Sequence, residues 1–430
     1  MSAVATNSYL TGLLAGRPAE GPQSRLNDLR AHAVDRVSAL TVPTTRDEDW
    51  RFTDISPLTK ISFQPARAQT TLTASDIARF ELPEAGARLT FVDGVYAPAL
   101  SFNRISVAIG NLAAEILRHD AAVSQHLARY AAFEHNAFAA LNTAFLNDGA
   151  LVTVPTNVVV GEPVHFLFIA TQPTAASYPR CLVVAEAGSG VTVVEDFVSL
   201  QDSAYFTNAV TEIAIADNAS VNHVRVQREG RQAFHIANCA VALGHSSRYR
   251  SVSVALGARI SRYNLDVEQT AEGAECAIDG LALITDSQLA DTHTSIDHAR
   301  AHGVSRQQHK CIVDGSAHAV FNGKIMVRHG AQLTNSSQSS RNLLLSAKAR
   351  VDTKPQLEIF ADDVKCAHGA TVGQLDADEV FYLKSRGLSD IAARNLLTYA
   401  FGAEIIDCIA VPSLRRALEE TVLLQTSRPT

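Results

Sequence analysis

The stretch Asp217-Asn218-Ala219-Ser220-Val221-Asn222-His223-Val224-Arg225-Val226 joins a turn of small and polar residues to a run in which β-branched and polar residues alternate. Alternation with a period of two is typical of a β-strand. The same combination recurs from about residue 147 to residue 363, with turns such as Ala187-Gly188-Ser189-Gly190 and Asp314-Gly315-Ser316-Ala317. More than 200 residues of this pattern are many for one sandwich, so the pattern favours the stacked coils of a β-helix, with a large sandwich as the alternative.

Helical patterning borders the strand-rich block on its N-terminal side. In residues 25–40, apolar side chains recur at steps of three and four, which predicts a helix. Alanine-rich helical patterning returns in residues 111–146, after a hairpin signal at Asp93-Gly94. We therefore expect a mostly helical region at 1–147 and a strand-rich core at 148–363.

A second helical region is expected at 364–430. Asp376 can cap one helix and Ser389 a second, which we expect to run to about Phe401 and to stop at Gly402. Residues 413–424 complete a small bundle. The default interpretation of the apolar residues in this region is a core within the chain, and only an exposed apolar remainder would indicate docking.

Composition and charge exclude several classes of function. Lysine and arginine total 37 and aspartate and glutamate 44, a net charge of −7, which is the wrong sign for binding nucleic acid through its phosphates. No window approaches the ~20 apolar residues of a membrane span, and the start of the chain lacks the basic segment of a signal peptide. Six cysteines without a C-x-x-C pair suit reduced thiols, so we expect a cytoplasmic protein.

Common catalytic motifs are missing from the sequence. There is no G-x-x-x-x-G-K-[ST] loop for nucleotide hydrolysis and no G-x-S-x-G nucleophile elbow. A β-helix enzyme acting on carbohydrate stays open as a less favoured alternative, although no catalytic cluster of carboxylates can be identified.

The most informative local pair is Cys366-Ala367-His368. A strand period of two puts the thiol and the imidazole on one face, where both can bind iron or zinc, but two ligands do not make a stable site. Taken alone, a buried cysteine beside a hydrogen-bonded histidine is the commoner arrangement. A second group of histidines, His293, His298, His302 and His309, has no metal-binding spacing, and the commoner interpretation of each is a polar residue on the surface of the solenoid. Trp50, in a charged segment, more often anchors a loop to a core than binds a partner.

The segment from Asp352 to Asp376, with Lys365-Cys366-Ala367-His368-Gly369-Ala370-Thr371-Val372-Gly373 at its centre, closely resembles the signature of the SufB/SufD family of iron–sulfur cluster assembly proteins. Further stretches agree with the resemblance and cover most of the chain: Glu48-Asp49-Trp50-Arg51-Phe52-Thr53-Asp54, Gln307-Gln308-His309-Lys310, Val320-Phe321-Asn322-Gly323-Lys324-Ile325-Met326-Val327, Asn342-Leu343-Leu344-Leu345-Ser346 and Phe381-Tyr382-Leu383-Lys384-Ser385-Arg386-Gly387.

The resemblance implies a mainly β fold: a right-handed parallel β-helix flanked by N-terminal and C-terminal helical regions. It is strongest to the D-type subunit, which implies a scaffold without its own ATPase site that pairs with SufB and binds the SufC ATPase. By motif, His368 matches a histidine at the interface with SufB, and Cys366 matches its neighbouring cysteine with less certain involvement. An iron–sulfur cluster or iron would be held there transiently, shared with SufB, and none would be bound permanently by this chain.

The resemblance also assigns the C-terminal helices to SufC docking. The residues expected there are Leu375, Phe381, Tyr382, Leu383, Arg386 and Leu388. Two further alternatives stay open: a B-type subunit, and a homodimeric structural adaptor in which Cys366 and His368 tolerate substitution.

Overall fold

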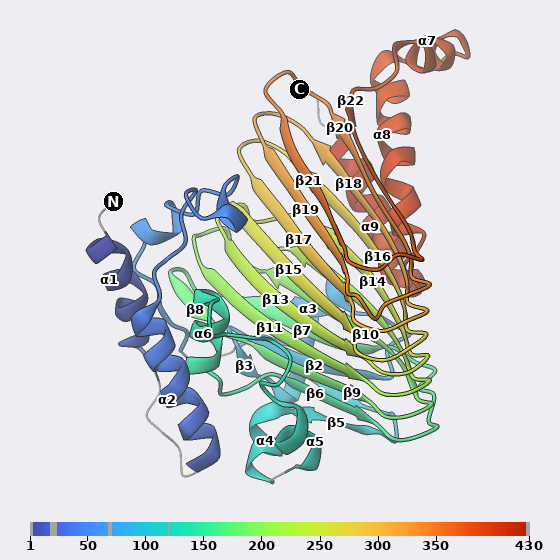
Figure 1. Cartoon of the computed structure of the whole chain (residues 1–430). Helices are drawn as coiled ribbons and strands as arrows, with labels where there is room; N and C mark the ends of the chain where they lie inside the picture. Colours follow the sequence, from blue (N-terminus) through green and yellow to red (C-terminus); the bar gives the residue numbers. More distant parts are fainter. Residues whose placement is uncertain (1–2, 18–23, 68–70, 119, 427–430) are drawn as a thin grey trace.

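The computed structural model describes residues 3–17, 24–67, 71–118 and 120–426, so the ends of the expected outer regions, 1–2 and 427–430, lie outside the described residues. At its centre is a parallel β-solenoid, in which each coil adds one strand to each of two facing sheets (Figure 1). Helices lie in both the N-terminal and the C-terminal regions. The predicted mainly β class, the solenoid core and the flanking helical regions are confirmed.

The two sheets are called A and B, and each is given from its C-terminal edge. The path of sheet A is β21 (Arg350–Ile359), β19 (His318–Val327), β17 (Leu289–His298), β15 (Ile260–Gln269), β13 (Phe234–Leu243), β11 (Phe206–Ile215), β9 (Arg180–Ala185), β6 (Ala150–Val154) and β5 (Ala108–Asn111). The path of sheet B is β22 (Lys365–Gly373), β20 (Asn335–Leu344), β18 (Val304–Val313), β16 (Glu275–Ile284), β14 (Arg248–Ala255), β12 (Ser220–Arg228), β10 (Gly190–Ser199), β7 (Val164–Ala170), β2 (Ala87–Val92) and β3 (Val95–Tyr96). Short strands β1 (Gln64–Pro65) and β8 (Ala175–Ser177) join sheet A, and β4 (Phe102–Asn103) joins sheet B.

Successive coils stack because their corners repeat. Strands that begin at Gly190, Ser220, Arg248, Glu275, Val304, Asn335 and Lys365 pair in parallel at intervals of 27 to 31 residues. Two residues before the first six of these positions, the backbone has a positive φ of 51° to 69°, at Gly188, Asn218, Ser246, Gly273, His302 and Leu333. Small or polar residues tolerate this conformation best, which explains the turns found in the sequence.

The interior changes in character along the solenoid. In the first coils, aromatic rings stack from strand to strand: Phe91 lies 5.2 Å from Phe168, and Phe168 lies 4.7 Å from Phe197, between ring centres. In the last coils, the buried side of β20 is polar and consists of Ser336, Gln338, Ser340 and Asn342.

N-terminal helices cover the N-terminal part of the outer face of sheet A (Figure 1). They include α1 (Ala3–Leu14), α2 (Ser24–Ala39) and α6 (Ala137–Ala144), and their shared core contains Phe138, Phe206 and Phe234. Three shorter helices are α3 (Ala74–Ile77), α4 (Leu112–Leu117) and α5 (Ala121–His126). The N-terminal region also supplies strands β2 and β5, and the expected hairpin is present as β2–β3, with positive φ at Asp93 and Gly94.

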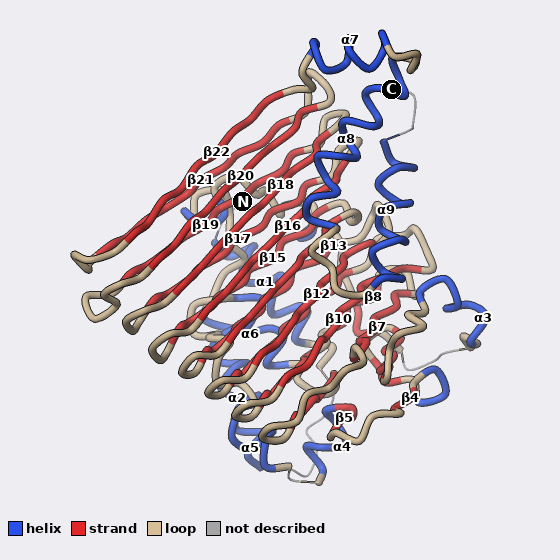
Figure 2. Tube along the Cα trace, turned by 90° about the vertical axis from the view of Figure 1, so that its right-hand side faces the viewer, coloured by secondary structure: helices blue, strands red, loops and turns tan. Residues whose placement is uncertain are grey.

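Among the described residues, three helices follow the solenoid, and the last two pack on the outer face of sheet B, whereas the first projects beyond it (Figure 2). They are α7 (Ala377–Ser385), α8 (Asp390–Ile406) and α9 (Pro412–Thr426), and the last two share a core with β12, β14 and β16. None of the helices in the described part of the chain is long and apolar enough to cross a membrane.

The C-terminal region differs from the sequence expectation in two ways. Strand β22 extends the solenoid to Gly373, past the expected boundary at residue 363, although the first helix begins at Ala377, directly after its expected cap Asp376. Gly402 lies inside α8 and does not end it. A Cβ atom on Gly402 would lie 3.3 Å from Ile312 Cδ1, so the glycine allows the helix to approach the sheet closely.

Candidate functional site

The C-terminal end of the solenoid is open. Strands β21 and β22, ten and nine residues long, are the last strands of their sheets, and each has a neighbour on only one side of the sheet. Such an edge presents unpaired backbone N–H and C=O groups, which can pair with another chain. The last coil therefore has the form of an association surface.

Cys366 and His368 lie on the inward face of this last coil. In β20, Ser336 pairs with Cys366 and Gln338 pairs with His368, and the side chains of Ser336 and Gln338 are buried in the interior. Side chains in register on adjacent parallel strands share a face. The thiol and the imidazole thus lie on the same face, as their spacing predicts, at the mouth of the solenoid.

The surroundings of the two side chains differ. Cys366 is half-buried and packs against the solenoid core, and this burial raises the pKa of its thiol. His368 is exposed and forms no hydrogen bond with any described residue. The commoner arrangement of a buried cysteine beside a hydrogen-bonded histidine is therefore not what the structure contains.

Exposed apolar side chains also lie on the last two strands of the solenoid. Val372 of β22 is 49% exposed, and Ile359 and Phe360, at the end of β21, are also exposed. Exposed apolar groups beside an unpaired sheet edge are typical of an association surface.

The pair does not complete a metal site by itself. Within the described residues, no group of three or more His, Cys, Asp or Glu side chains could hold a metal ion. Thiolate and imidazole both suit iron, so an ion bound at Cys366 and His368 would need further ligands from another molecule.

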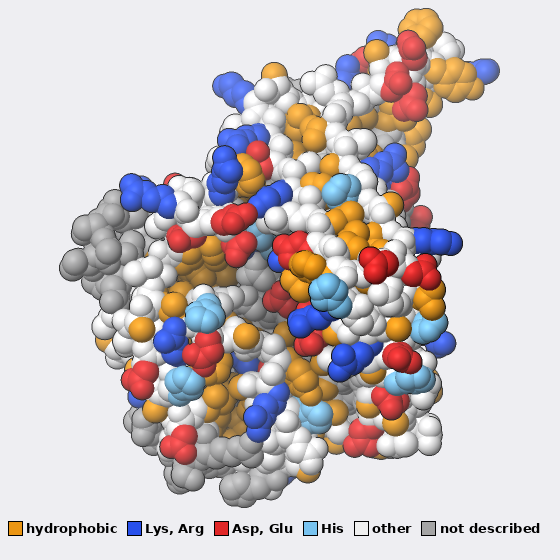
Figure 3. All heavy atoms as spheres, in the orientation of Figure 1, with side chains coloured by type: hydrophobic (Ala, Val, Ile, Leu, Met, Phe, Trp, Pro, Cys, Tyr) orange, Lys and Arg blue, Asp and Glu red, His pale blue; other side chains and the backbone are white. Residues whose placement is uncertain are grey.

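Three of the six residues expected to dock an ATPase lie on α7 and the other three directly flank it, and α7 projects from the body of the molecule (Figures 1 and 2). Phe381 is 72% exposed and Tyr382 56% exposed, and the Arg386 guanidinium lies 5.1 Å from the Tyr382 ring centre. Leu375, Leu383 and Leu388 are half-buried. Hydrophobic side chains accordingly gather on this arm at the upper right of Figure 3. The default interpretation of Phe381 as core is wrong, because α7 packs through Val380.

A groove lies beneath this arm. It encloses about 800 Å³ between the first half of α8 and the corner of sheet B, and Leu345, Phe381 and Ile391 are among its lining residues. Its apolar lining continues the exposed face of α7.

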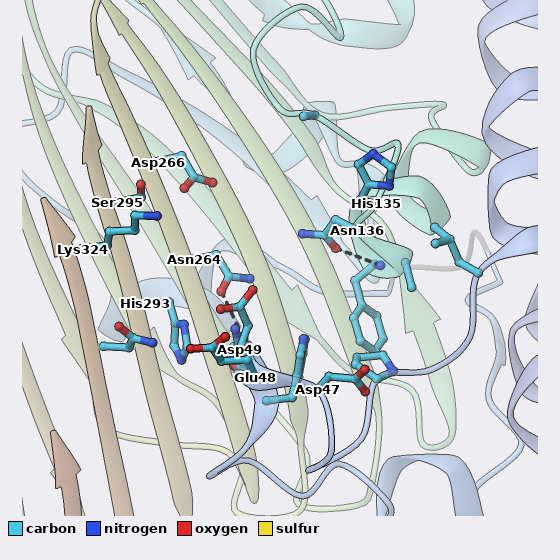
Figure 4. Close-up of a pocket in the computed structure, with 18 of the residues that line it drawn as sticks. Asp47, Glu48, Asp49, His135, Asn136, Asn264, Asp266, His293, Ser295 and Lys324 are labelled. Atoms are coloured by element: carbon cyan, nitrogen blue, oxygen red, sulfur yellow. Dashed lines mark hydrogen bonds between the residues drawn. The ribbon is translucent and has the colours of Figure 1, made fainter. Parts of the chain in front are cut away.

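A second cavity, of about 730 Å³, separates the N-terminal segment around Trp50 from the outer face of sheet A (Figure 4). Arg262 stacks 3.8 Å from the Trp50 ring centre and donates to the Asp49 carbonyl oxygen at 2.7 Å. Trp50 thus anchors its loop, as predicted. Asp266 faces this cavity and is exposed to it; the segments around the cavity raise its pKa to about 6, mainly through desolvation, and solvent access keeps the effect on stability small.

The four histidines of the second group do not meet at one place. His293 lies 3.0 Å from the Asp291 carboxylate, and His298 bonds to Ser305 at 2.9 Å. His302 occupies a corner with positive φ, and His309 stacks on Phe321. His302 is exposed and His293 is half-buried, but His298 and His309 are buried, so the interpretation as surface residues is wrong for these two.

Sequence reasoning missed Lys310, which lies in the buried run His309-Lys310-Cys311-Ile312. Its ammonium is 2.6 Å from the Glu404 carboxylate of α8. A lysine inside an otherwise buried strand was the available signal.

Comparison with known proteins covers nearly the whole chain. Residues 168–401 match the SUF system FeS cluster assembly, SufBD core domain, and residues 19–166 match the SufBD protein N-terminal region. The chain is 43% identical over 423 residues to an iron–sulfur cluster assembly SufBD family protein of Synechocystis, covering 94% of this chain and 92% of that protein. It is 33% identical over 382 residues to the iron–sulfur cluster assembly protein SufD of Escherichia coli, covering 87% of each chain.

A more distant relative is the iron–sulfur cluster assembly protein SufD of Bacillus subtilis, 27% identical over 92% of this chain and 93% of that protein. The similarity therefore includes both the solenoid and the N-terminal region. The chain belongs to the SufB/SufD family of SUF-system iron–sulfur cluster assembly proteins and is SufD-like within it.

Proposed function

We propose that this chain is a scaffold subunit without enzymatic activity, which pairs through its open solenoid end with a SufB-type partner. The observation that carries the proposal is the unpaired edge of β21 and β22, with Cys366 and His368 at its mouth. Pairing with the edge of a second solenoid would satisfy the free backbone groups and cover the exposed apolar side chains.

In this proposal, a nascent iron–sulfur cluster, or iron on its way into one, is cargo at the interface. His368 offers an imidazole with no other partner in the described chain, and Cys366 can contribute a thiolate. Because a cluster takes about four protein ligands, the SufB-type partner supplies the rest. An incomplete ligand set in one chain suits cargo that is assembled and then released.

The projecting arm is the proposed docking site of the SufC-type ATPase. Its exposed aromatic side chains, Phe381 and Tyr382, have the character of interface anchors, and Arg386 adds a cation beside them. ATP-driven movement of the docked subunit would reach the solenoid through α8. The six unpaired cysteines suit a reducing compartment, and we keep the cytoplasm as the proposed location.

The test is co-purification with candidate SufB and SufC proteins, followed by anaerobic reconstitution with iron and sulfide and a UV–visible spectrum. We expect His368→Ala to leave the complex assembled and to abolish the iron–sulfur absorbance. His245→Ala is the matched control, because His245 is exposed at a corner in the middle of the solenoid.

Each other result has a distinct meaning. A His368→Ala complex with unchanged absorbance would assign the cluster to the partner alone and leave this chain an adaptor. Loss of the complex would show that His368 is structural. A chain that forms only a homodimer, or that binds SufC without SufB, would favour the homodimeric or the B-type alternative.

A further inference from the structure

The ammonium group of a lysine is buried between the outer face of sheet B and α8, and it is not part of the association surface at the open end. The side chain of Lys310, on β18, is 0% exposed. Its Nζ atom lies 2.6 Å from Glu404 Oε2, donates to the Phe401 carbonyl oxygen at 2.8 Å and lies 4.5 Å from the Phe401 ring centre. A lysine is rarely buried unless its charge is paired, so these contacts form a built site between the sheet and α8.

Glu404 ties α8 to two adjacent strands. Besides Lys310, its carboxylate accepts from Gln308 Nε2 of β18 at 3.2 Å and from Arg341 NH1 of β20 at 3.4 Å. Lys310, Arg341 and Thr371 follow one another in register across β18, β20 and β22. We call Lys310, Glu404 and Arg341 the α8 clamp.

A further hydrogen bond connects the strand of Arg341 to β22, the strand that carries His368. Asn342, next to Arg341, donates from Nδ2 to the Thr371 carbonyl oxygen of β22 at 2.9 Å. Thr371 lies three residues after His368 on the same nine-residue strand. Arg341 is therefore connected to β22 through the Asn342 side-chain bond and the backbone ladder between β20 and β22.

The two halves of α8 are held differently. Its second half packs on sheet B, because Ile405 and Ile406 are buried in the apolar core shared with β14 and β16. In its first half, Ala393 and Thr398 are buried, but Ile391, which is 59% exposed, lines the groove of about 800 Å³. The second half of α8 is thus held by the apolar core of sheet B, whereas the first half is only partly packed and borders the groove next to α7.

We propose that Lys310 is a positioning residue, and that the α8 clamp passes movement of α7 and the first half of α8 to the strand carrying Cys366 and His368. This inference rests on the proposed docking of an ATPase at α7. A rigid connection at Glu404 makes the sheet follow the helix, whereas apolar packing alone lets the helix slide over the sheet.

The experiment measures hydrogen exchange of residues 365–373 in the complex of the full chain with SufB-type and SufC-type partners, with and without ATP. In the wild-type complex we expect ATP to increase the exchange. Lys310→Met and Glu404→Gln are each expected to lose this ATP-dependent increase while the ATPase stays bound and hydrolyses ATP. The control is Glu420→Gln, an exposed position on α9 without an ion pair among the described residues, which should behave as wild type.

Other outcomes overturn the inference. A wild-type-sized ATP response in Lys310→Met would show that the clamp transmits nothing, and so would an intact wild-type complex without any ATP response. Loss of the ATPase from Lys310→Met would make Lys310 a support of the fold only. Failure of the proposed function is distinguished by a wild-type chain that does not co-purify with the ATPase at all.

Discussion

The two ends of the solenoid are built differently. At the N-terminal end, sheet A finishes in the four-residue strand β5 and sheet B in the two-residue strand β3, and both pair antiparallel with their neighbours. At the C-terminal end, the ten-residue β21 and the nine-residue β22 are left unpaired on one side. Short edge strands protect a sheet from unwanted pairing, whereas long ones invite it.

The side chains inside the solenoid also differ between the two ends. Stacked phenylalanines fill the first coils, whereas serines, glutamine and asparagine line the interior beneath β22. Apolar burial supplies most of the free energy of folding, so the N-terminal coils stabilise the molecule. The C-terminal coil gives up part of that stabilisation, and its exposed groups remain available for association.

The largest difference in stability between the two ends is expected when one carboxylate of an ion pair is replaced by an amide. Glu212 of β11 pairs with fully buried Arg180 at 2.7 Å and accepts from the backbone N–H of Ala128, Tyr130 and Ala131. Glu212→Gln leaves the guanidinium without a counter-charge, so we expect the free energy of unfolding to fall by about 3 kcal/mol. Urea denaturation followed by circular dichroism measures this.

The matched control for Glu212→Gln is Glu358→Gln on β21. Glu358 pairs with Lys324 at 2.9 Å, and both side chains are partly exposed, so this change should cost less than about 1 kcal/mol. Equal losses for the two variants would contradict the view that stability is concentrated at the N-terminal end.

A smaller effect is expected when one valine at each end of the solenoid is shortened to alanine. Val193 of β10 is buried in the solenoid core, whereas Val372 of β22 is about half exposed. Val193→Ala should lower the free energy of unfolding by about 2 kcal/mol, because it removes buried apolar surface and leaves a cavity. Val372→Ala should change it by about 0.5 kcal/mol or less in the isolated chain. If Val372→Ala were the more destabilising change, the last coil would already be covered.

The smallest effect concerns Asp266, in the cavity between the N-terminal segment and sheet A. Its pKa is raised from 3.8 to about 6, chiefly by desolvation, with repulsion from Asp49 added and attraction to His293 opposing. Since the folded state holds the proton more tightly than the unfolded state, ionised Asp266 destabilises the fold above pH 6 and has no such effect below its unfolded value.

Asp266→Asn should therefore raise Tm at pH 8, and the gain should shrink as the pH falls from about 6 and disappear below about 4. Thermal unfolding of both proteins across this range measures the difference. A gain of the same size at every pH would show that the asparagine acts through packing and that the carboxylate is not strained.

Much of the architecture is encoded locally. The alternation in Val221-Asn222-His223-Val224-Arg225-Val226 and the small and polar residues before it predict a strand after a turn, and both are present, with Asn218 in the turn at a φ of 59°. Asp376 and Ser389 cap α7 and α8 as expected, because a capping side chain acts within a few residues of its own position. The prediction that Gly402 ends the helix is wrong. A glycine that ends a helix and a glycine that lets a helix pack closely on a sheet cannot be told apart from the sequence alone.

The sequence by itself determined the strand period, the corner residues, the helix caps and the placement of Cys366 and His368 on one face, since each depends on neighbours along the chain. Only the tertiary structure decided that β22 is the last strand, that Phe381 lies exposed on a projecting helix, and that Lys310 meets Glu404 across 94 residues. Whether a side chain is covered depends on where the stacking of coils ends and on which distant segment packs against it, and neither is a local property of the chain.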